Sequence, residues 1–170
     1  LKDEFVKPGK TCHIIGSRNL PHRVFFGRYI SQLEARMRAY APTACIGSNG
    51  TQTGTLLAQL QRFPYFIETD HTAWDLHVSD QLLDALNDEY RRIFIVPPSD
   101  AYYFDLVLKS YLHTTWKFRN GIKYDLKGTR CSGDVDTTAG NSLIHIALNR
   151  AVARLSGLHP EDMDQRVKGD

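Results

Sequence analysis

The chain has 170 residues, of which 42% are hydrophobic and 24% are charged, with a formal net charge of +2. This length and composition suffice for one compact domain with a hydrophobic core, and they exclude a disordered chain or a small disulfide-stapled protein. The three cysteines form no CxxC pair, which favours a reducing, intracellular setting, and no apolar run is long enough to predict a membrane span.

The small net charge conceals a strong segregation of charge along the chain. Residues 1–40 carry a net charge of +5, residues 68–105 carry −7, and residues 106–130 carry +5. This alternation suits a protein in which some segments hold a phosphate backbone and others gather carboxylates for metal ions. Charge alone is equally consistent with a solvated surface on which like charges happen to cluster.

The first half of the chain is predicted to form two helices, a loop and a strand. Apolar residues at helical spacing predict a helix over residues 28–40 with a basic outer face. Residues 47–54 contain three glycines and predict a polar loop, and the aromatic and β-branched residues 65–69 predict a strand that ends at Asp70. Ser79 and Asp80 predict the start of a helix that continues to about Ile93.

The second half is predicted to hold two more helices and a hairpin. Pro97 to Asp100 ends one element and caps the next, so residues 101–112 are predicted to be helical. Asn120-Gly121 predicts the turn of a hairpin between strands 114–118 and 122–126. A loop over residues 128–136 then precedes a long helix over residues 137–155, and the last residues form a weakly indicated strand.

Three aspartates are placed where metal ligands often lie. Asp70 directly follows the predicted strand 65–69, Asp75 comes five residues later, and Asp170 lies 100 residues after Asp70. If Asp70 and Asp170 end neighbouring strands, their oxygens could share a pair of Mg²⁺ ions. Two aspartates five residues apart also recur by chance, so Asp70 and Asp75 alone are weak evidence for a metal site.

A second group of candidates lies in the small-residue loop and in the helix that follows it. Ser132-Gly133 lets another backbone approach closely, Thr137 begins the predicted helix, and Asn141 lies one turn further on the same face. The Asn141 amide offers a donor and an acceptor suited to a hydroxyl. An ordinary capped helix with one buried polar residue would explain the same pattern.

Taken in order, these motifs resemble those of viral RNA-dependent RNA polymerases, especially the positive-strand tombusvirus-, carmovirus- and nodavirus-like enzymes. The basic segment after Lys2-Asp3-Glu4 is similar to the fingertip motif F. Thr69 to Ser79 is similar to motif A, Gly128 to Asn141 to motif B, and Val167 to Asp170 to motif C as far as its first aspartate. The resemblance spans the whole chain, and motif B is its most specific part.

The resemblance implies an α+β fold, namely the fingers and palm portion of a right-hand polymerase, with a small antiparallel palm sheet backed by helices. It divides the chain into a fingertip portion (1–64), palm with motif A (65–96), a fingers insertion (97–127) and palm with motif B and a truncated motif C (128–170). It implies transfer of ribonucleoside monophosphates from triphosphates to an RNA 3′-hydroxyl by a two-metal mechanism.

The same resemblance implies roles for individual residues. Asp70 and Asp170 would be catalytic ligands of two Mg²⁺ ions, which Mn²⁺ could replace. The ribose and the template would be bound by Asp75, Ser132, Gly133, Thr137 and Asn141. The triphosphate would be bound by Lys2, Lys10, Arg18 and Arg23.

The family also implies partners and a setting. The partners are an RNA template with its nascent strand, nucleoside triphosphates, and a thumb that these residues do not include. The expected location is the host cytoplasm, in a viral replication complex. Without the second motif C aspartate and the thumb, we expect the chain by itself to be inactive. His13 stands where many relatives carry the motif F arginine, and a neutral imidazole cannot supply that permanent charge.

Three alternatives remain open on sequence grounds. A reverse transcriptase would keep the palm, but such enzymes place a bulky aromatic residue near the ribose, whereas Asp75 and Asn141 are polar. A non-catalytic RNA-binding domain would use the basic segments and leave the acids on the surface. A zinc site is the weakest alternative, because the histidines and cysteines lack paired ligand spacings.

Overall fold

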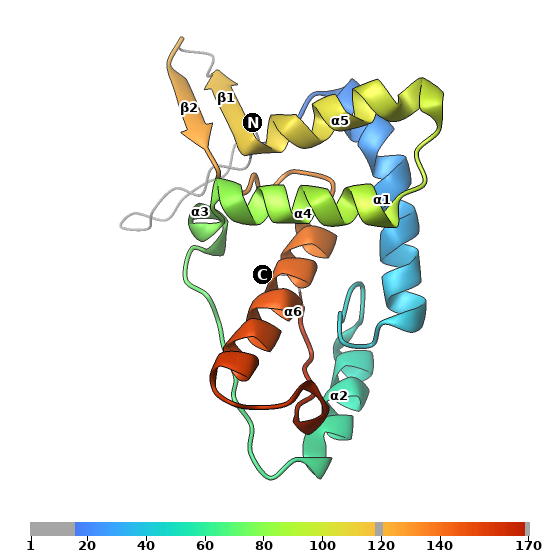
Figure 1. Ribbon diagram of the computed structural model, residues 1–170, viewed down its shortest axis with the longest axis vertical. Helices are drawn as coiled ribbons and strands as arrows, with labels where there is room; N and C mark the ends of the chain where they lie inside the picture. Colours follow the sequence, from blue (N-terminus) through green and yellow to red (C-terminus); the bar gives the residue numbers. More distant parts are fainter. Residues whose placement is uncertain (1–15, 118–120, 169–170) are drawn as a thin grey trace. The chain divides into compact units, whose positions relative to one another are not determined.

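The computed structural model of the chain describes residues 16–117 and 121–168 (Figure 1). These residues form an α+β structure, as the sequence predicts at this level. Among them are six α-helices, two 3₁₀ helices and one two-stranded antiparallel sheet. In chain order the elements are α1 (Leu20–Tyr40), α2 (Gly50–Ala58), η1 (Gln59–Arg62), α3 (Trp74–His77), α4 (Asp80–Ile93), α5 (Pro98–Leu112), β1 (His113–Lys117), β2 (Lys123–Lys127), α6 (Thr137–Leu155) and η2 (Pro160–Asp162).

The described residues divide into two compact units. Unit 1 takes in the residues up to Gly27 together with Ala73–Thr137, and unit 2 takes in Arg28–Thr72 together with the residues from Thr138 onward. The chain passes between the units at three points: inside α1, between Thr72 and Ala73 just before α3, and at the start of α6. The division by polymerase motif into residues 1–64, 65–96, 97–127 and 128–170 follows a different criterion and stays a prediction.

The core of unit 1 is an aromatic cluster between α4, α5 and the first turns of α1. Phe26 is fully buried, and its ring centroid lies 5.6 Å from that of Tyr90, 5.9 Å from Phe104 and 5.7 Å from Tyr111. The buried amide of Asn87 donates to the carbonyl of Leu108 at 3.0 Å and ties α4 to α5. Aromatic edges packed this way add to the free energy gained from burial alone.

The predicted helices of unit 1 are confirmed. The Ser79 side chain accepts a hydrogen bond from the backbone N–H of Leu82, so α4 begins where the cap predicts. The second helix was predicted from Ala101 but begins at Pro98, because proline tolerates the first helical turn, where its missing N–H has no intrahelical partner. The structure also contains the short helix α3, which the sequence did not predict.

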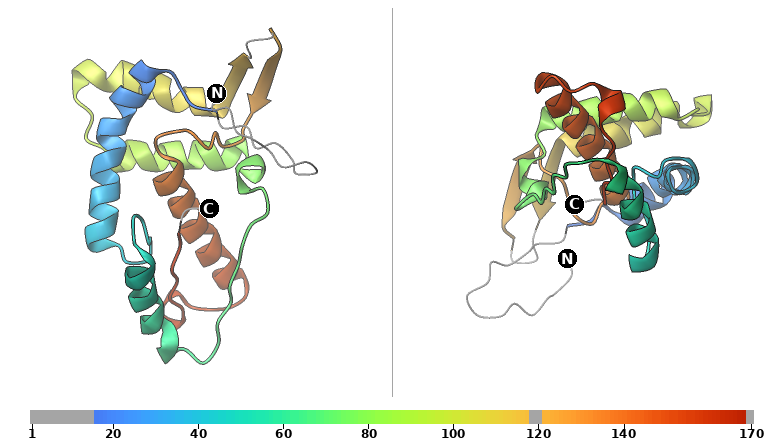
Figure 2. Two further views of the ribbon diagram at one scale, coloured as in Figure 1. Left: turned by 180° about the vertical axis from the view of Figure 1, so that it is seen from behind. Right: turned by 90° about the horizontal axis from the view of Figure 1, so that it is seen from below.

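The predicted hairpin is also confirmed. Strands β1 and β2 pair in register from His113 opposite Lys127 to Lys117 opposite Lys123. Gly121 has φ +87°, a left-handed conformation that glycine adopts at little cost and that suits the Asn120-Gly121 turn prediction. The hairpin continues directly from α5 and extends away from α4 and α5 (Figures 1 and 2).

In unit 2, three predicted elements differ from the structure. The helix predicted over residues 28–40 begins earlier, at Leu20. The loop predicted over residues 47–54 gives way to α2, because the side chains of Asn49 and Gln52 exchange hydrogen bonds with each other's backbone N–H groups in a capping box. Residues 65–69 form no strand. Tyr65 and Ile67 are 87% and 91% exposed, and no described segment pairs with them.

Elsewhere in unit 2, backbone hydrogen bonds link residues 43–45 to Val167. Ala44 and Val167 form an isolated parallel bridge, in which the N–H of Val167 donates to the carbonyl of Thr43 at 2.7 Å. Close by in sequence, Arg166 and Arg62 both pair with Asp164. The weakly predicted terminal strand is therefore represented by this bridge, and residues 169–170 lie outside the described residues.

The long helix α6 spans Thr137 to Leu155, as predicted at both ends. Its buried residues include Asn141, Ser142 and His145, an unusually polar set for a buried helix face. Buried polar groups cost free energy unless they are paired, so residues of this kind on one face indicate a functional surface or a polar network.

Candidate active-site loop

The loop between β2 and α6, residues 128–136, is held against the rest of unit 1 by backbone hydrogen bonds. Gly128 and Thr129 both adopt left-handed backbone conformations, with φ +71° and +62°. They turn the chain so that the N–H of Thr129 donates to the carbonyl of Val78 at 2.7 Å, and the N–H of Arg130 to that of Asp75 at 2.8 Å. A Cβ on Gly128 would lie 2.7 Å from the backbone nitrogen of Asp80, so the close approach requires glycine.

This attachment brings together two of the predicted binding residues. The Ser132 hydroxyl donates a short hydrogen bond of 2.5 Å to Oδ2 of Asp75, which lies in α3. Together with the backbone bond from Arg130, it links the motif A segment to the motif B loop at two points. The result is a carboxylate and a hydroxyl side by side, both half-buried, which is an arrangement that can bind a polyhydroxylated ligand.

Gly133 and Thr137 also fulfil what the sequence predicts of their local structure. The N–H of Gly133 donates to the carbonyl of Gly16 at 3.0 Å, and a Cβ at Gly133 would lie 2.5 Å from that oxygen. A backbone therefore approaches closely, as expected of the Ser-Gly pair. The Thr137 hydroxyl donates to the carbonyl of Asp134 at 2.8 Å, where α6 begins.

A buried ion pair that the sequence did not predict lies beneath the loop. Arg130 donates to the carboxylate of Asp136 at 2.9 Å and to its backbone carbonyl at 2.6 Å, and both side chains are 1% exposed. The Tyr90 hydroxyl from α4 donates to the same carboxylate at 2.9 Å. Burial opposes the charge of Arg130, but Asp136, Tyr90, Tyr111 and Asp134 together outweigh it and raise the guanidinium pKa.

A second pair involves Arg18, which the sequence assigns to the triphosphate. Its Nε donates to Oδ1 of Asp134 at 3.1 Å, and its NH2 donates to the Thr114 hydroxyl at 2.8 Å. Burial raises the pKa of Asp134 to about 6 even though the Arg18 charge acts in the opposite direction. Arg18 is thus bound within the loop assembly, and its contact with a triphosphate stays a prediction.

No simple sequence rule indicates that these loop charges are buried. Arg130, Asp134 and Asp136 are spaced among small residues, a pattern also typical of a solvated turn. Tyr90 could be assigned to the apolar face of α4, but its hydroxyl partner comes from 46 residues away in the chain. Only the tertiary fold brings the four side chains together.

In unit 2, the predicted residues Asn141 and Asp70 belong to segments joined by a ring contact. Asn141 and His145 lie one turn apart on the same face of α6, and the rings of His145 and His71 stack with centroids 4.9 Å apart. His71 directly follows Asp70, whose side chain is exposed. Asn141 is 1% exposed, and neither its amide oxygen nor its amide nitrogen has a hydrogen-bond partner among the described residues.

The other predicted site residues are less informative. Arg23 lies exposed on α1, while Lys2, Lys10 and Asp170 lie outside the described residues, as does His13. Among residues 16–117 and 121–168, no three histidine, cysteine, aspartate or glutamate side chains are grouped so that they could hold a metal ion. Within the same residues, Cys45 and Cys131 are buried free thiols.

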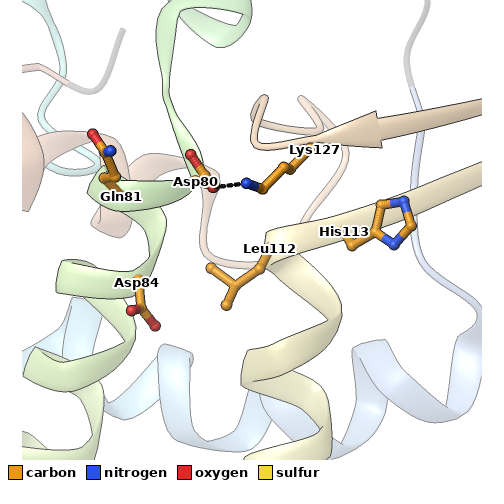
Figure 3. Close-up of a pocket in the computed structure, with 6 residues that line it drawn as sticks. All are labelled: Asp80, Gln81, Asp84, Leu112, His113 and Lys127. Atoms are coloured by element: carbon orange, nitrogen blue, oxygen red, sulfur yellow. Dashed lines mark ion pairs between the residues drawn. The ribbon is translucent and has the colours of Figure 1, made fainter.

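A shallow cavity of about 390 Å³ opens beside the start of α4 (Figure 3). Its lining comes from α4, from the junction of α5 with β1, and from the end of β2: Asp80, Gln81, Asp84, Leu112, His113 and Lys127. Lys127 pairs with Asp80 at 2.9 Å across it, an exposed ion pair that contributes little to stability. None of the predicted site residues lines this cavity.

Comparison with known proteins gives the class to which this fold and loop belong. The family model described as viral RNA dependent RNA polymerase matches residues 4–164, which is nearly the whole chain. The chain therefore belongs to the viral RNA-dependent RNA polymerase family, and the resemblance seen in its motifs is confirmed.

Its relatives include polymerases of several plant viruses. The chain is 27% identical over 177 residues to the RNA-directed RNA polymerase of Groundnut rosette virus (strain MC1), 31% over 157 residues to that of Pothos latent virus (isolate Pigeonpea/India), and 29% over 158 residues to that of Tomato bushy stunt virus (strain Cherry). These matches cover 93%, 82% and 86% of this chain. They cover 20%, 20% and 19% of the relatives, so the chain spans about a fifth of their length.

None of the helices in the described part of the chain combines the length and the apolar character needed to cross a membrane.

Proposed function

We propose that this chain forms part of the fingers and palm of an RNA-directed RNA polymerase. The reaction is attack of an RNA 3′-hydroxyl on the α-phosphate of a ribonucleoside triphosphate, with release of pyrophosphate. Family membership supports this assignment. The observation that carries it is the hydrogen bond between Ser132 and Asp75. This bond joins motif A to motif B, and the proposal assigns both motifs to the binding of one nucleotide.

Asp75, Asn141 and Thr137 are proposed to recognise the ribose 2′-hydroxyl. Ser132 is a single donor to Asp75, and a carboxylate offers about four lone-pair positions, so Asp75 can still accept from a sugar hydroxyl. The Asn141 amide is buried without a partner among the described residues, which is costly unless a ligand or another group pairs with it. Ser132 and Gly133 are proposed to contact the template and the incoming nucleotide.

Asp70 and Asp170 are proposed to hold two Mg²⁺ ions, for which Mn²⁺ could substitute. Carboxylate oxygens are the ligands that Mg²⁺ prefers, and Asp70 is exposed and able to serve as one. When bound, such ions stabilise the developing charge on the attacking and leaving oxygens. The task of Asp70 in this proposal is to fix the ions beside the nucleotide that Asp75 and Asn141 orient.

Lys2, Lys10, Arg18 and Arg23 are proposed to neutralise the triphosphate. Arg18 can do so while it stays bound to Asp134, since the bonds to Asp134 and Thr114 use two of the five N–H donors of its guanidinium. The proposal therefore assigns Arg18 two tasks, which are holding the motif B loop and facing the phosphates with its remaining donors.

The proposed partners are an RNA template, its nascent strand, nucleoside triphosphates and the thumb of the same polymerase. The proposed setting is a viral replication complex in the host cytoplasm. Because the chain corresponds to about a fifth of the length of its relatives, we expect the isolated 170 residues not to synthesise RNA. Template-dependent extension of a primer by the purified chain would contradict this expectation.

The proposal is tested in a complete polymerase that carries this segment. Asp70→Asn keeps the size of the side chain, and it is expected to abolish nucleotide incorporation while RNA binding and the thermal unfolding midpoint stay unchanged. Incorporation that survives would remove Asp70 as a metal ligand and favour the non-catalytic RNA-binding alternative.

The ribose assignment is tested separately. Asn141→Ala is expected to reduce the preference for ribonucleotides over deoxynucleotides, measured as the ratio of kcat/KM for the two substrates. An unchanged ratio would exclude Asn141 from sugar recognition. Equal use of both sugars by the unsubstituted enzyme would contradict the assignment and favour a polymerase with other substrates, such as a reverse transcriptase.

A further inference from the structure

Two lysines of the hairpin, Lys117 and Lys123, differ from the other described basic residues of segment 106–130 in their ion pairing. The other three described basic residues in this segment all have carboxylate partners: Lys109 pairs with Asp105, Lys127 with Asp80, and the buried Arg130 with Asp136. Lys117 and Lys123 are exposed, and neither makes an ion pair with any residue that the structure describes. Among the described residues of this segment, the positive charge available to a ligand therefore lies at these two positions.

The two lysines stand directly opposite each other. Lys117 pairs with Lys123 in the antiparallel register, so their side chains leave the same face of the hairpin. Like charges at directly opposed positions destabilise a strand pair. The hairpin thus keeps a repulsive pair at the end nearest its turn, although one acidic residue at either position would have produced an attractive pair.

The opposite face of the hairpin is anchored to the rest of unit 1. Thr114 is buried and accepts a hydrogen bond from Arg18, and the Trp116 ring lies against Gly16, where no Cβ could fit. Side chains alternate between the faces of a strand, so anchoring Thr114 and Trp116 turns Lys117 and Lys123 away from this contact. The hairpin extends beyond α4 and α5, which leaves the lysines at a projecting end (Figure 2).

We propose that Lys117 and Lys123 form a contact site for the phosphate backbone of RNA. A phosphate between the two ammonium groups would turn their mutual repulsion into a shared attraction. Lysine is a compact point charge that binds phosphate without reading the base, which suits an enzyme that must accept any sequence. This inference rests on the proposed function, because the RNA is the polymerase's template or product strand.

Asp125 limits where the phosphate can bind. It belongs to the next pair on the same face, two residue pairs further from the turn, and accepts a hydrogen bond from its cross-strand neighbour Thr115 at 2.6 Å. Its negative charge repels a phosphate there, so the site lies at the Lys117–Lys123 pair and the adjoining end of the hairpin. We therefore expect Asp125→Asn to strengthen RNA binding, whereas substitution of either lysine weakens it.

The test measures RNA affinity of a complete polymerase carrying this segment as a function of salt concentration. The double variant Lys117→Gln/Lys123→Gln should reduce the slope of log K against log salt by about 1.4 for single-stranded RNA, at about 0.7 per phosphate contact. If affinities converge at 1 M salt, this slope corresponds to about 25-fold weaker binding at 0.1 M. Fluorescence anisotropy of a labelled RNA measures both quantities.

A matched control removes two charges that already have partners in the same unit. Arg92 pairs with Glu89 and Lys109 with Asp105, both on exposed helix faces. The variant Arg92→Gln/Lys109→Gln has the same change in net charge as the hairpin variant, and we expect its salt slope to stay within experimental error of the unsubstituted value. Equal losses in the two variants would mean that only net charge matters, and would overturn the site.

A single substitution separates binding from folding. Lys123→Glu replaces the repulsive pair by an attractive one, so it should raise the thermal unfolding midpoint while lowering RNA affinity more than Lys123→Gln does. If the variants keep their RNA affinity but lose association with another protein or with another part of the polymerase, the hairpin is a protein contact and the proposal is wrong. Failure of the hairpin site can be distinguished from failure of the proposed function, because the loss of synthesis expected in Asp70→Asn tests that function without changing the hairpin.

Discussion

Two buried groups of unit 1 are expected to titrate in the same pH range with opposite effects on stability. His22 is packed edge-on against Tyr111 and lies 3.3 Å from the Ser110 hydroxyl, and burial, reinforced by the Arg18 charge, lowers its pKa to about 4. Burial raises the pKa of Asp134 to about 6. Arg18 connects the two, since it pairs with Asp134 and disfavours a charge on His22.

The signs follow from which state binds the proton. Between about pH 6.5 and 4, the unfolded chain protonates His22 and the native state does not, so acidification lowers the free energy of unfolding. Between about pH 6 and 4, the native state protonates Asp134 and the unfolded chain does not, so acidification raises it. Each shift of about two pKa units corresponds to about 3 kcal/mol, and the two contributions nearly cancel.

The assay is urea unfolding followed by tryptophan fluorescence between pH 4.5 and 7. Trp74 and Trp116 are the only tryptophans of the chain and both belong to unit 1, so they report on the relevant part. We expect an almost flat profile for the unsubstituted chain. Asp134→Asn should show stability that falls on acidification, and His22→Gln stability that rises, each by up to about 1.4 kcal/mol per pH unit. With an m value of about 2 kcal/mol/M, that is about 0.7 M urea per pH unit.

The slope is the decisive quantity, because both variants also lose contacts and shift in absolute stability. Asp134→Asn leaves Arg18 without its carboxylate, and His22→Gln removes ring packing, but neither loss depends on pH in this range. If both variants kept the slope of the unsubstituted chain, neither group would be buried as described. If both changed in the same direction, the assignment of opposite signs would be refuted.

Three further outcomes test other parts of the structure. Arg130→Met leaves a buried carboxylate without its cation and should lower the free energy of unfolding by about 3–5 kcal/mol, whereas Arg92→Met on the surface should cost less than about 1 kcal/mol; urea unfolding compares them. Gly128→Ala forces a Cβ into the backbone of α4 from a left-handed conformation, so it should cost at least about 1–3 kcal/mol in the same assay and slow RNA synthesis by the complete polymerase. Asn49→Ala removes the capping box of α2 and should cost about 1 kcal/mol, seen as faster amide exchange over Gly50–Ala58.

The sequence predicts elements well where local chemistry decides them. Ser79 caps α4, Asn120-Gly121 turns the hairpin, and α6 begins at Thr137 and ends at Leu155. Each of these features depends on side-chain or backbone preferences within a few residues. The capping box at Asn49 obeys the same rules, but the three glycines of residues 47–54 favour a loop, because glycine is a poor helix former.

The strand predicted over residues 65–69 fails for a different reason. Tyr65, Phe66 and Ile67 have high β propensity, but a strand requires a neighbour to accept and donate its backbone hydrogen bonds, and no described segment provides one. Propensity describes how well a residue fits a pleated and half-buried surface. It cannot supply that surface, so the segment is extended and exposed.

The candidate site shows the same limit. The family resemblance implies that Asp75 and Ser132 bind the same nucleotide, and the structure places their side chains in hydrogen-bond contact. It could not predict that Arg130, Asp134 and Asp136 are buried beneath them, because burial depends on residues from α4 and from the chain before α1. The net charge of +5 over residues 106–130 is the clearest example, because the sequence does not reveal which of these charges are buried.

That charge separates into two kinds once the fold is known. Arg130 is buried and pairs with Asp136, and this ion pair holds the loop that carries Ser132. Lys117 and Lys123 keep theirs on the surface and face each other, an arrangement that gains stability only from an added anion. A basic segment therefore serves two purposes in one polymerase motif region. Part of it fixes the geometry of the proposed nucleotide site, and part of it remains available to the RNA that this site is proposed to copy.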